Sequence, residues 1–415
     1  MVESMVRLAT WMPFAPAGRM ITYFTRVDLS TPTVRRNTEK SGAAYVAVQT
    51  EQLGILERDT PEAPAGPAVQ LLSVDGAMVP LVGGEWTEVK TLALGTVKVR
   101  LGKDGQLEVE AEDLSYFSRL ADADTFGRLA TVETHRRGTE KAGVVCAVVD
   151  GAEWEQKFID LHSPEAVRIL DWGHASEYVT KAGQAVFGVG TAELSEWLGV
   201  QLYELRHGEP KHMLRALGAL RKELAEQVAR GEPKGEALAV VTNSLHYLGK
   251  RRAQIRYAEF AAQGYPIGSG AVESANKLVV EARLKGAGMH WARVHVDPMV
   301  ALRTIACSDR WEEAWPQISL RLRQQKGERA EARRTQRKES QALLVGSEAC
   351  ETTEAEPVLP SPRTTAATAA RTAAASPTVE GASGPQRPAP NHPWRHMPIG
   401  KAAFSGPRSV ASAES

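Results

Sequence analysis

Four acidic residues stand where a fold could gather them around a divalent metal ion. Asp75, Asp150 and Asp171 each follow directly after an apolar run. Glu273 follows a glycine-rich turn, Gly268-Ser269-Gly270, at the predicted start of an amphipathic helix. Short apolar runs are typical of buried strands, and carboxylates at strand ends are suitable oxygen ligands for Mg²⁺. The sequence therefore predicts a metal site, provided that the fold brings these segments together.

Each of these acids also has a plainer interpretation. Asp75 and Asp150 are both followed by glycine, and Asp-Gly is a common hairpin turn. Glu273 would suit the first turn of a helix because of the helix dipole. Asp171 and His174 could form a structural hydrogen-bonded pair at a strand end. The order of the acids along the chain, more than any single acid, favours the metal site.

The elements predicted around the acids indicate an α/β fold. A separation of 75 residues (150 − 75) between Asp75 and Asp150 can hold two strands and a helix, whereas the 21 residues (171 − 150) before Asp171 cannot. The order β-β-β-α-β-α-β, then a helical stretch and an acid-bearing helix, is the layout of an RNase H-like mixed sheet with an all-helical insertion. Strands are predicted over 69–74, 88–94, 107–110, 144–149 and 167–170, with helices over 121–137 and 154–161.

Five segments are predicted along the chain. In the first, Thr33 would cap a short helix, Ser41-Gly42 would form a turn, and 43–56 would form a second helix. This arrangement suits a DNA-reading helix-turn-helix, but it also suits any helical hairpin. The C-terminal segment is rich in Ala, Thr, Pro and Ser, which predicts disorder. The segments are 1–65 (small N-terminal helical region), 66–180 (first part of the core), 181–264 (helical insertion, with helices over 237–248 and 251–262), 265–325 (second part of the core) and 340–415 (disordered tail).

Composition limits the class of protein. Lys and Arg together equal Asp and Glu at 50 each, so bulk charge does not indicate a nucleic-acid binder. The charge is unevenly spread, because Arg321 to Lys338 contain eight basic residues and two acidic ones. Three cysteines without metal-ligand spacing suggest a reducing cytoplasm. No stretch approaches the roughly 20 apolar residues of a membrane span.

Four motifs in this order resemble a known family. Leu170-Asp171-Trp172-Gly173-His174 is similar to the Cys/Asp-x-x-His signature of Mutator-related transposases. Across about residues 30 to 315 the chain resembles a bacterial insertion-sequence DDE transposase of the ISKra type. The other motifs are Ser73-Val74-Asp75-Gly76 with Gly84-Glu85-Trp86, then Val149-Asp150-Gly151-Ala152-Glu153-Trp154, and Pro266 to Ser274 continuing into Arg283 to Trp291.

The resemblance implies a function and a set of site residues. It implies that Asp75, Asp150 and Glu273 are catalytic and hold two Mg²⁺ ions, for which Mn²⁺ is expected to substitute, with Asp171 and His174 as accessory residues. The reaction would be strand cleavage at transposon ends and 3′-OH strand transfer into target DNA. The DNA contacts expected on this basis are Lys250, Arg251, Arg252, Arg256, Lys277, Arg283 and Lys285.

The partners expected from the resemblance are the terminal inverted repeats and target DNA, bound by a homo-oligomer in the bacterial cytoplasm at the nucleoid, without a membrane. Two alternatives stay open. One is an RNase H-like nuclease that cleaves DNA without joining it. The other is a catalytically inactive DNA-binding remnant of a transposase. The basic cluster at Lys250 to Arg256 could also be only a solvated helix face.

Overall fold

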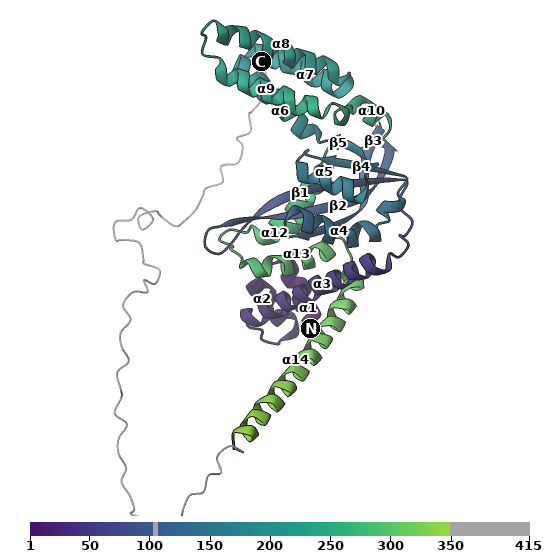
Figure 1. The fold of residues 1–415 in the computed structure, drawn as a ribbon, viewed down its shortest axis with the longest axis vertical. Coiled ribbons are helices and arrows are strands. Elements are labelled where there is room, and N and C mark those ends of the chain that lie inside the picture. Colours follow the sequence, from purple (N-terminus) through teal and green to yellow (C-terminus); the bar gives the residue numbers. More distant parts are fainter. Residues whose placement is uncertain (103–106, 349–415) are drawn as a thin grey trace, which may run out of the picture. The chain divides into compact units, whose positions relative to one another are not determined.

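A five-stranded mixed sheet carries the acid-bearing segments (Figure 1). The computed structural model describes residues 1–102 and 107–348. The strand order is β3-β2-β1-β4-β5, with antiparallel β1–β2 and β2–β3 pairs and parallel β1–β4 and β4–β5 pairs. This confirms a mixed α/β fold. The strands are β1 (Val69–Pro80), β2 (Trp86–Leu101), β3 (Leu107–Arg119), β4 (Val144–Val149) and β5 (Val167–Leu170).

The register of the parallel strands brings three aspartates level with one another. Leu72 pairs with Ala147 in the β1–β4 ladder. Extending that register by three residues (72 + 3, 147 + 3) sets Asp75 beside Asp150. In the β4–β5 ladder Val149 pairs with Leu170, so one further residue on each strand sets Asp150 beside Asp171. Acids that are distant in sequence therefore meet at one level of the sheet.

Asp75 differs from its prediction in one respect. It does not end its strand, since β1 continues to Pro80 and Asp75 pairs with Thr91 of β2. The Asp75-Gly76 dipeptide is therefore part of a strand and not a hairpin turn. A Cβ on Gly76 would lie 2.2 Å from Oε1 of Glu88, so a larger residue there would require the flexible Glu88 side chain to move.

The described chain contains fourteen α-helices, and α7, α8 and α9 form a group of their own above the sheet in the view of Figure 1. Residues Met1–Gly346 form one compact unit. No helix in the described part of the chain is long and apolar enough to cross a membrane. The helices are α1 (Val2–Trp11), α2 (Phe14–Thr25), α3 (Thr31–Asp59), α4 (Ala123–Arg136), α5 (Glu153–His162), α6 (Trp172–Phe187), α7 (Ala192–His207), α8 (Pro210–Ala229), α9 (Gly235–Lys250), α10 (Tyr257–Ala262), α11 (Gly270–Ala275), α12 (Ala282–Leu284), α13 (Arg293–Cys307) and α14 (Trp311–Glu348), with short 3₁₀ segments η1 (Thr139–Lys141) and η2 (Arg252–Gln254) and a π-helix η3 (Asn276–Glu281).

The alternation of β1 divides the core between the two faces of the sheet. Leu72 and Val74 pack with Phe126 of α4 and Phe158 of α5. Ala77 and Val79, on the opposite face, pack with α11, η3 and α13. Because successive side chains of a strand point to opposite faces, Asp75 shares the face of Ala77 and Val79. Its carboxylate is therefore positioned on the side of the sheet that carries α11 and η3.

The predicted turn at Ser41-Gly42 is wrong. α3 runs unbroken from Thr31 to Asp59, and its N-cap is Ser30, not Thr33. Gly42 is needed for a helix crossing, because a Cβ there would lie 2.0 Å from the carbonyl oxygen of Pro298 in α13. A glycine that permits close helix contact has the same sequence signature as a turn glycine, and no helix-turn-helix is formed at Ser41-Gly42.

Three further boundaries differ from the predictions. β2 and β3 extend well past their predicted ends, because they pair with each other along a long hairpin with a bulge between Leu94 and Thr96. The helix expected over 251–262 is divided into η2 and α10. α14 continues to Glu348, into the segment predicted to be disordered, through a run of good helix formers. The rest of that predicted tail, 349–415, lies outside the described residues.

Candidate metal centre

Three carboxylates converge beside the parallel strands. Asp75 in β1, Asp150 directly after β4 and Glu155 in the first turn of α5 each offer an oxygen, and these oxygens lie within 4.8 Å of one another. The two aspartates are half-buried, and Glu155 is buried. Carboxylate oxygens gathered in this way are the donor set of a hard divalent cation such as Mg²⁺ or Mn²⁺.

Both carboxylate oxygens of Asp75 already accept a hydrogen bond. The Gly76 N–H donates to Oδ1 over 2.6 Å, and the Asn276 side-chain amide donates to Oδ2 over 2.9 Å. Burial raises the pKa of Asp75, and the nearby charge of Asp150 adds to this rise against the opposing effect of these hydrogen bonds. A cation between the two carboxylates would remove their mutual repulsion.

Glu155 is the member of the cluster that the sequence did not single out. Its Oε2 accepts hydrogen bonds from the N–H groups of Gly151 and Ala152, at 2.9 and 3.0 Å, and so caps the start of α5. Burial, assisted by a hydrogen bond with Asp150, raises the pKa of Glu155 to about 10. The only sequence signal was an acid at the third position of a helix that follows a strand-end aspartate, and helix capping alone explains that signal.

Asn276 contacts the acidic cluster through Asp75. It begins the π-helix η3, and its side chain is only 6% exposed. While Nδ2 donates to Asp75, Oδ1 has no hydrogen-bond partner among the described residues. Buried polar atoms are nearly always satisfied, and π-helical segments are frequent at functional sites. An unsatisfied amide oxygen on a residue bonded to Asp75 is a candidate additional ligand for a cation at this cluster.

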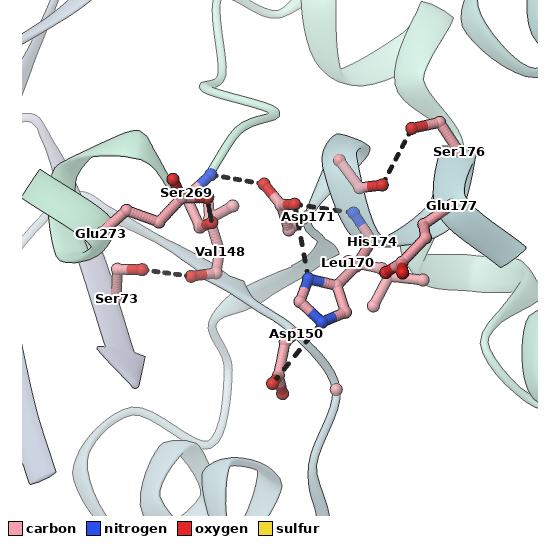
Figure 2. A network of polar contacts seen from close by, with 12 residues as sticks. Ser73, Val148, Asp150, Leu170, Asp171, His174, Ser176, Glu177, Ser269 and Glu273 are labelled. Carbon is pink, nitrogen blue, oxygen red and sulfur yellow. Dashed lines mark hydrogen bonds and ion pairs between the residues drawn. The ribbon is translucent and has the colours of Figure 1, made fainter. Parts of the chain in front are cut away.

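His174 lies between two of the aligned aspartates (Figure 2). Its Nε2 is 3.9 Å from Oδ2 of Asp150, and its Nδ1 is 3.8 Å from Oδ2 of Asp171. The interaction with Asp171 raises the pKa of His174, and the charge of Asp150 contributes to the same rise. The imidazole therefore tends to hold a proton beside the acidic cluster.

Asp171 accepts hydrogen bonds that connect neighbouring elements. Its Oδ2 accepts the His174 N–H over 2.8 Å and so caps α6, while its Oδ1 accepts the Ser269 N–H over 2.6 Å. Burial alone would raise the pKa of Asp171, but the hydrogen bonds from His174 and Ser269 together lower it to about 2. Asp171 is therefore a structural anchor that joins β5, α6 and the turn before α11.

Glu273 does not belong to the three-carboxylate cluster. It lies in α11, is exposed, and accepts a hydrogen bond from Ser269 Oγ over 3.3 Å (Figure 2). The N-cap of α11 is Ser269, and Glu273 lies in the first turn of this helix. The structure thus brings Asp75 and Asp150 together as predicted, links Glu273 to Asp171 through Ser269, and has Glu155 as the third clustered acid.

Helix α9 contacts the Asp150 loop directly. The Tyr247 hydroxyl donates to the carbonyl oxygen of Asp150, and the Arg251 guanidinium donates to the carbonyl oxygen of Gly151. Arg251 also lies 3.8 Å from the Tyr247 ring centroid. Gly151 has φ +88°, and a Cβ there would lie 2.5 Å from Arg251 Nε, so only glycine suits this position. Arg251 therefore supports the acidic loop.

The other predicted DNA contacts differ in their exposure. Lys250, Arg252 and Lys277 are exposed, and none forms an ion pair within the described chain. Arg256 is exposed and pairs with Glu259 at 3.0 Å, while half-buried Lys285 pairs with Glu281 at 2.6 Å.

The prediction that Arg283 contacts DNA is wrong. The side chain is buried, donates to the Ala9 carbonyl oxygen over 3.0 Å, and lies over the rings of Phe14 and Trp291. Its guanidinium joins the N-terminal helices to the segment after η3 and is not accessible to a phosphate. A sequence cannot distinguish such a buried arginine from an exposed one when both occur in a basic segment.

Neither a known protein-family model nor a curated protein sequence matches this chain. The function therefore has to be inferred from the fold and from the geometry of the acidic cluster.

Proposed function

We propose that the protein is a DDE transposase that cleaves and joins DNA with the help of Mg²⁺. The observation that carries this proposal is the meeting of Asp75, on the central strand, with Asp150, at the end of the adjacent parallel strand. The strand order β3-β2-β1-β4-β5, in which β1, β4 and β5 are parallel, supports an RNase H-like interpretation of the sheet.

The residues present fit a divalent metal ion. Asp75, Asp150 and Glu155 would supply carboxylate oxygens, and the unsatisfied Oδ1 of Asn276 would supply an amide oxygen. When bound, Mg²⁺ would neutralise the phosphate charge and lower the pKa of an attacking hydroxyl or water. From the resemblance, Glu273 is proposed to complete the catalytic set when DNA is bound.

The residues of this chain would position the reacting groups. In cleavage, a water oxygen bonds to phosphorus as the P–O3′ bond breaks and leaves a 3′-OH. In joining, that 3′ oxygen bonds to a target phosphorus as a second P–O bond breaks. Both steps take a proton from the attacking oxygen and give one to the leaving oxygen. His174, held by Asp171, can carry such a proton at Nε2.

Exposed cations close to the Asp150 loop are proposed to contact the DNA backbone. Lys250 and Arg252 flank Arg251, which is bonded to that loop. Neutralising Lys250 and Arg252 should flatten the salt dependence of DNA binding by about one unit of slope for each lost phosphate contact. An unchanged slope would show that these residues are only a solvated helix face.

The proposal is tested with the full chain and the DNA that flanks its coding region. Mg²⁺ should support nicking at the ends and joining to a second duplex, whereas EDTA or Asp75→Asn should stop both steps. Cleavage without joining would favour a nuclease of similar fold. Specific binding with neither reaction would favour an inactive remnant, and the absence of binding and cleavage would refute all three interpretations.

A further inference from the structure

The second half of α14 is a strongly basic helix with little acidic compensation. From Arg321 to Arg337 it contains seven basic residues and two acidic ones, Glu328 and Glu331. The first half is anchored, because Trp311 and Ile318 are buried in a core shared with α1, α3 and α13. After Gln325, every side chain up to Arg337 is exposed. The helix therefore presents these cations to solvent on a fixed support.

Part of this basic surface forms a groove with α3. The groove has a volume of about 380 Å³, and four cations line it: Lys40 of α3 and Lys326, Arg329 and Arg333 of α14. No acidic residue lines the groove. Arg321, which precedes it, pairs with Glu51 of α3 at 3.2 Å and fixes the two helices to each other. The charged side chains that line this concave surface are therefore all positive.

The cations of the groove are not neutralised within the described chain. Within the described residues, no ion pair is formed by Lys326, Arg329 or Arg333. In contrast, Arg321 pairs with both Glu51 and Glu328. Arg329 and Arg333 are four residues apart, a spacing at which like charges on a helix repel each other. Residues 326, 329 and 333 lie on one helix face, so the repulsion is concentrated there. An anionic ligand would relieve it.

We propose that this groove between α3 and α14 binds the sugar–phosphate backbone of duplex DNA. The three cations of α14 lie within eight consecutive residues, about 10 Å along the helix axis. Duplex DNA carries about one charge per 1.7 Å of its axis, so a row of fixed cations suits it better than a single small anion. The groove lies outside the acidic cluster, and binding there would not require catalysis.

The matched variants come from the same helix. Arg329→Gln with Arg333→Gln removes two groove arginines, and Arg323→Gln with Arg334→Gln removes two exposed arginines that do not line the groove. Binding of the full chain to a duplex of arbitrary sequence is measured by fluorescence anisotropy in EDTA over a range of salt concentrations. Circular dichroism checks that each variant keeps its helix content. The single variant Lys326→Gln tests the third groove cation of α14 independently of the arginine pair.

The groove pair should lower the salt slope by about two units and Lys326→Gln by about one, while the control pair stays near the parent value. Equal losses for the two pairs, or no loss for either, would overturn the proposal. Binding to polyglutamate should respond little to the groove pair, and an equal response would show a general anion site instead of a DNA site. Because EDTA prevents cleavage, failure here would leave the proposed catalytic activity intact.

Discussion

Asn276 donates a hydrogen bond from its side-chain amide to Oδ2 of Asp75 over 2.9 Å. The two residues are 201 positions apart in the chain, and the bond joins the centre of β1 to the first residue of the π-helix η3. It fixes the orientation of one carboxylate oxygen of Asp75. It also leaves Oδ1 of Asn276 buried without a partner. One side chain thus both positions a proposed metal ligand and offers another oxygen.

Replacing Asn276 should therefore lower DNA cleavage and weaken metal binding. Asn276→Ala removes a hydrogen bond to a charged group, which is worth about 1.5–3 kcal/mol. We expect DNA cleavage to fall on the order of 10- to 100-fold, and Mn²⁺ binding to weaken as well. Ser274→Ala is the matched control, because Ser274 is exposed in the preceding helix. Equal activity of the two variants would remove Asn276 from the site.

The clustered carboxylates should control metal binding in the DNA-free protein. Asp75→Asn and Asp150→Asn remove a carboxylate from the cluster, and Glu155→Gln removes a carboxyl group that would lose its proton when a cation binds. All three changes keep the side-chain shape. Each should weaken Mn²⁺ binding by roughly tenfold or more, measured by titration calorimetry, since carboxylates are the charged ligands. Glu273→Gln should leave this affinity near the parent value because Glu273 lies outside the cluster. A reversed pattern would assign the third ligand to Glu273 in the free protein.

The effects of acid replacements on DNA cleavage should differ from their effects on metal binding. Asp75→Asn, Asp150→Asn and Glu273→Gln should each lower cleavage on the order of a hundredfold or more, comparable to loss of one transition-state donor. Asp171→Asn should be milder, because Asp171 anchors β5 and α6 and is not one of the proposed catalytic acids. An inactive Asp171→Asn together with an active Asp75→Asn would contradict the proposed assignment of the acids.

The meeting of Asp75 and Asp150 could be predicted because the positions of the buried strands and the separation between them, although not the full strand lengths, follow from the local sequence. Apolar runs mark the buried strands, and the space between them limits the possible order. Register cannot be obtained in this way, so the alignment of Asp171 with the other two aspartates required the structure. Glu155 was missed because its position is fully explained by capping of α5.

The N-terminal helices show why the rest could not be predicted. Gly42 appeared to end a helix, but its role depends on the approach of Pro298, which is more than 250 residues away in the chain. Likewise, Arg283 occurs in a basic segment, and only the packing of Phe14 and Trp291 around it shows that it is buried. Local patterns describe local elements, whereas contacts between distant elements decide exposure and side-chain role.

The crossing of α3 and α13 gives a test of the fold that is independent of function. Gly42→Ala places a Cβ 2.0 Å from the Pro298 carbonyl oxygen, a backbone atom that cannot move aside easily. We expect a loss of about 1–3 kcal/mol in the free energy of unfolding, measured in urea. Gly54→Ala on the same helix meets no atom within 4 Å. It should stabilise the protein by up to about 1 kcal/mol, because alanine is the better helix former.

The last prediction concerns His162, at the end of α5. Its Nε2–H donates to the Gly127 carbonyl oxygen over 2.9 Å, and its Nδ1 lies 3.1 Å from the Thr134 hydroxyl, which can donate to it. Burial lowers the pKa of His162 from 6.5 to about 4, against the effect of the Gly127 hydrogen bond. The folded protein therefore keeps this imidazole neutral in a range of pH where the unfolded chain protonates it.

The sign of the pH effect follows from this difference. Above pH 6.5 both states are neutral at His162, so the residue adds no pH dependence. Between pH 6.5 and about 4 the unfolded state binds the extra proton, and stability falls as the pH is lowered, by roughly 3 kcal/mol in total. In urea unfolding across this range, His162→Gln should have a flatter profile than the parent. His246→Gln, which changes an exposed histidine, should keep the parent profile, and an unchanged slope in His162→Gln would contradict the assignment.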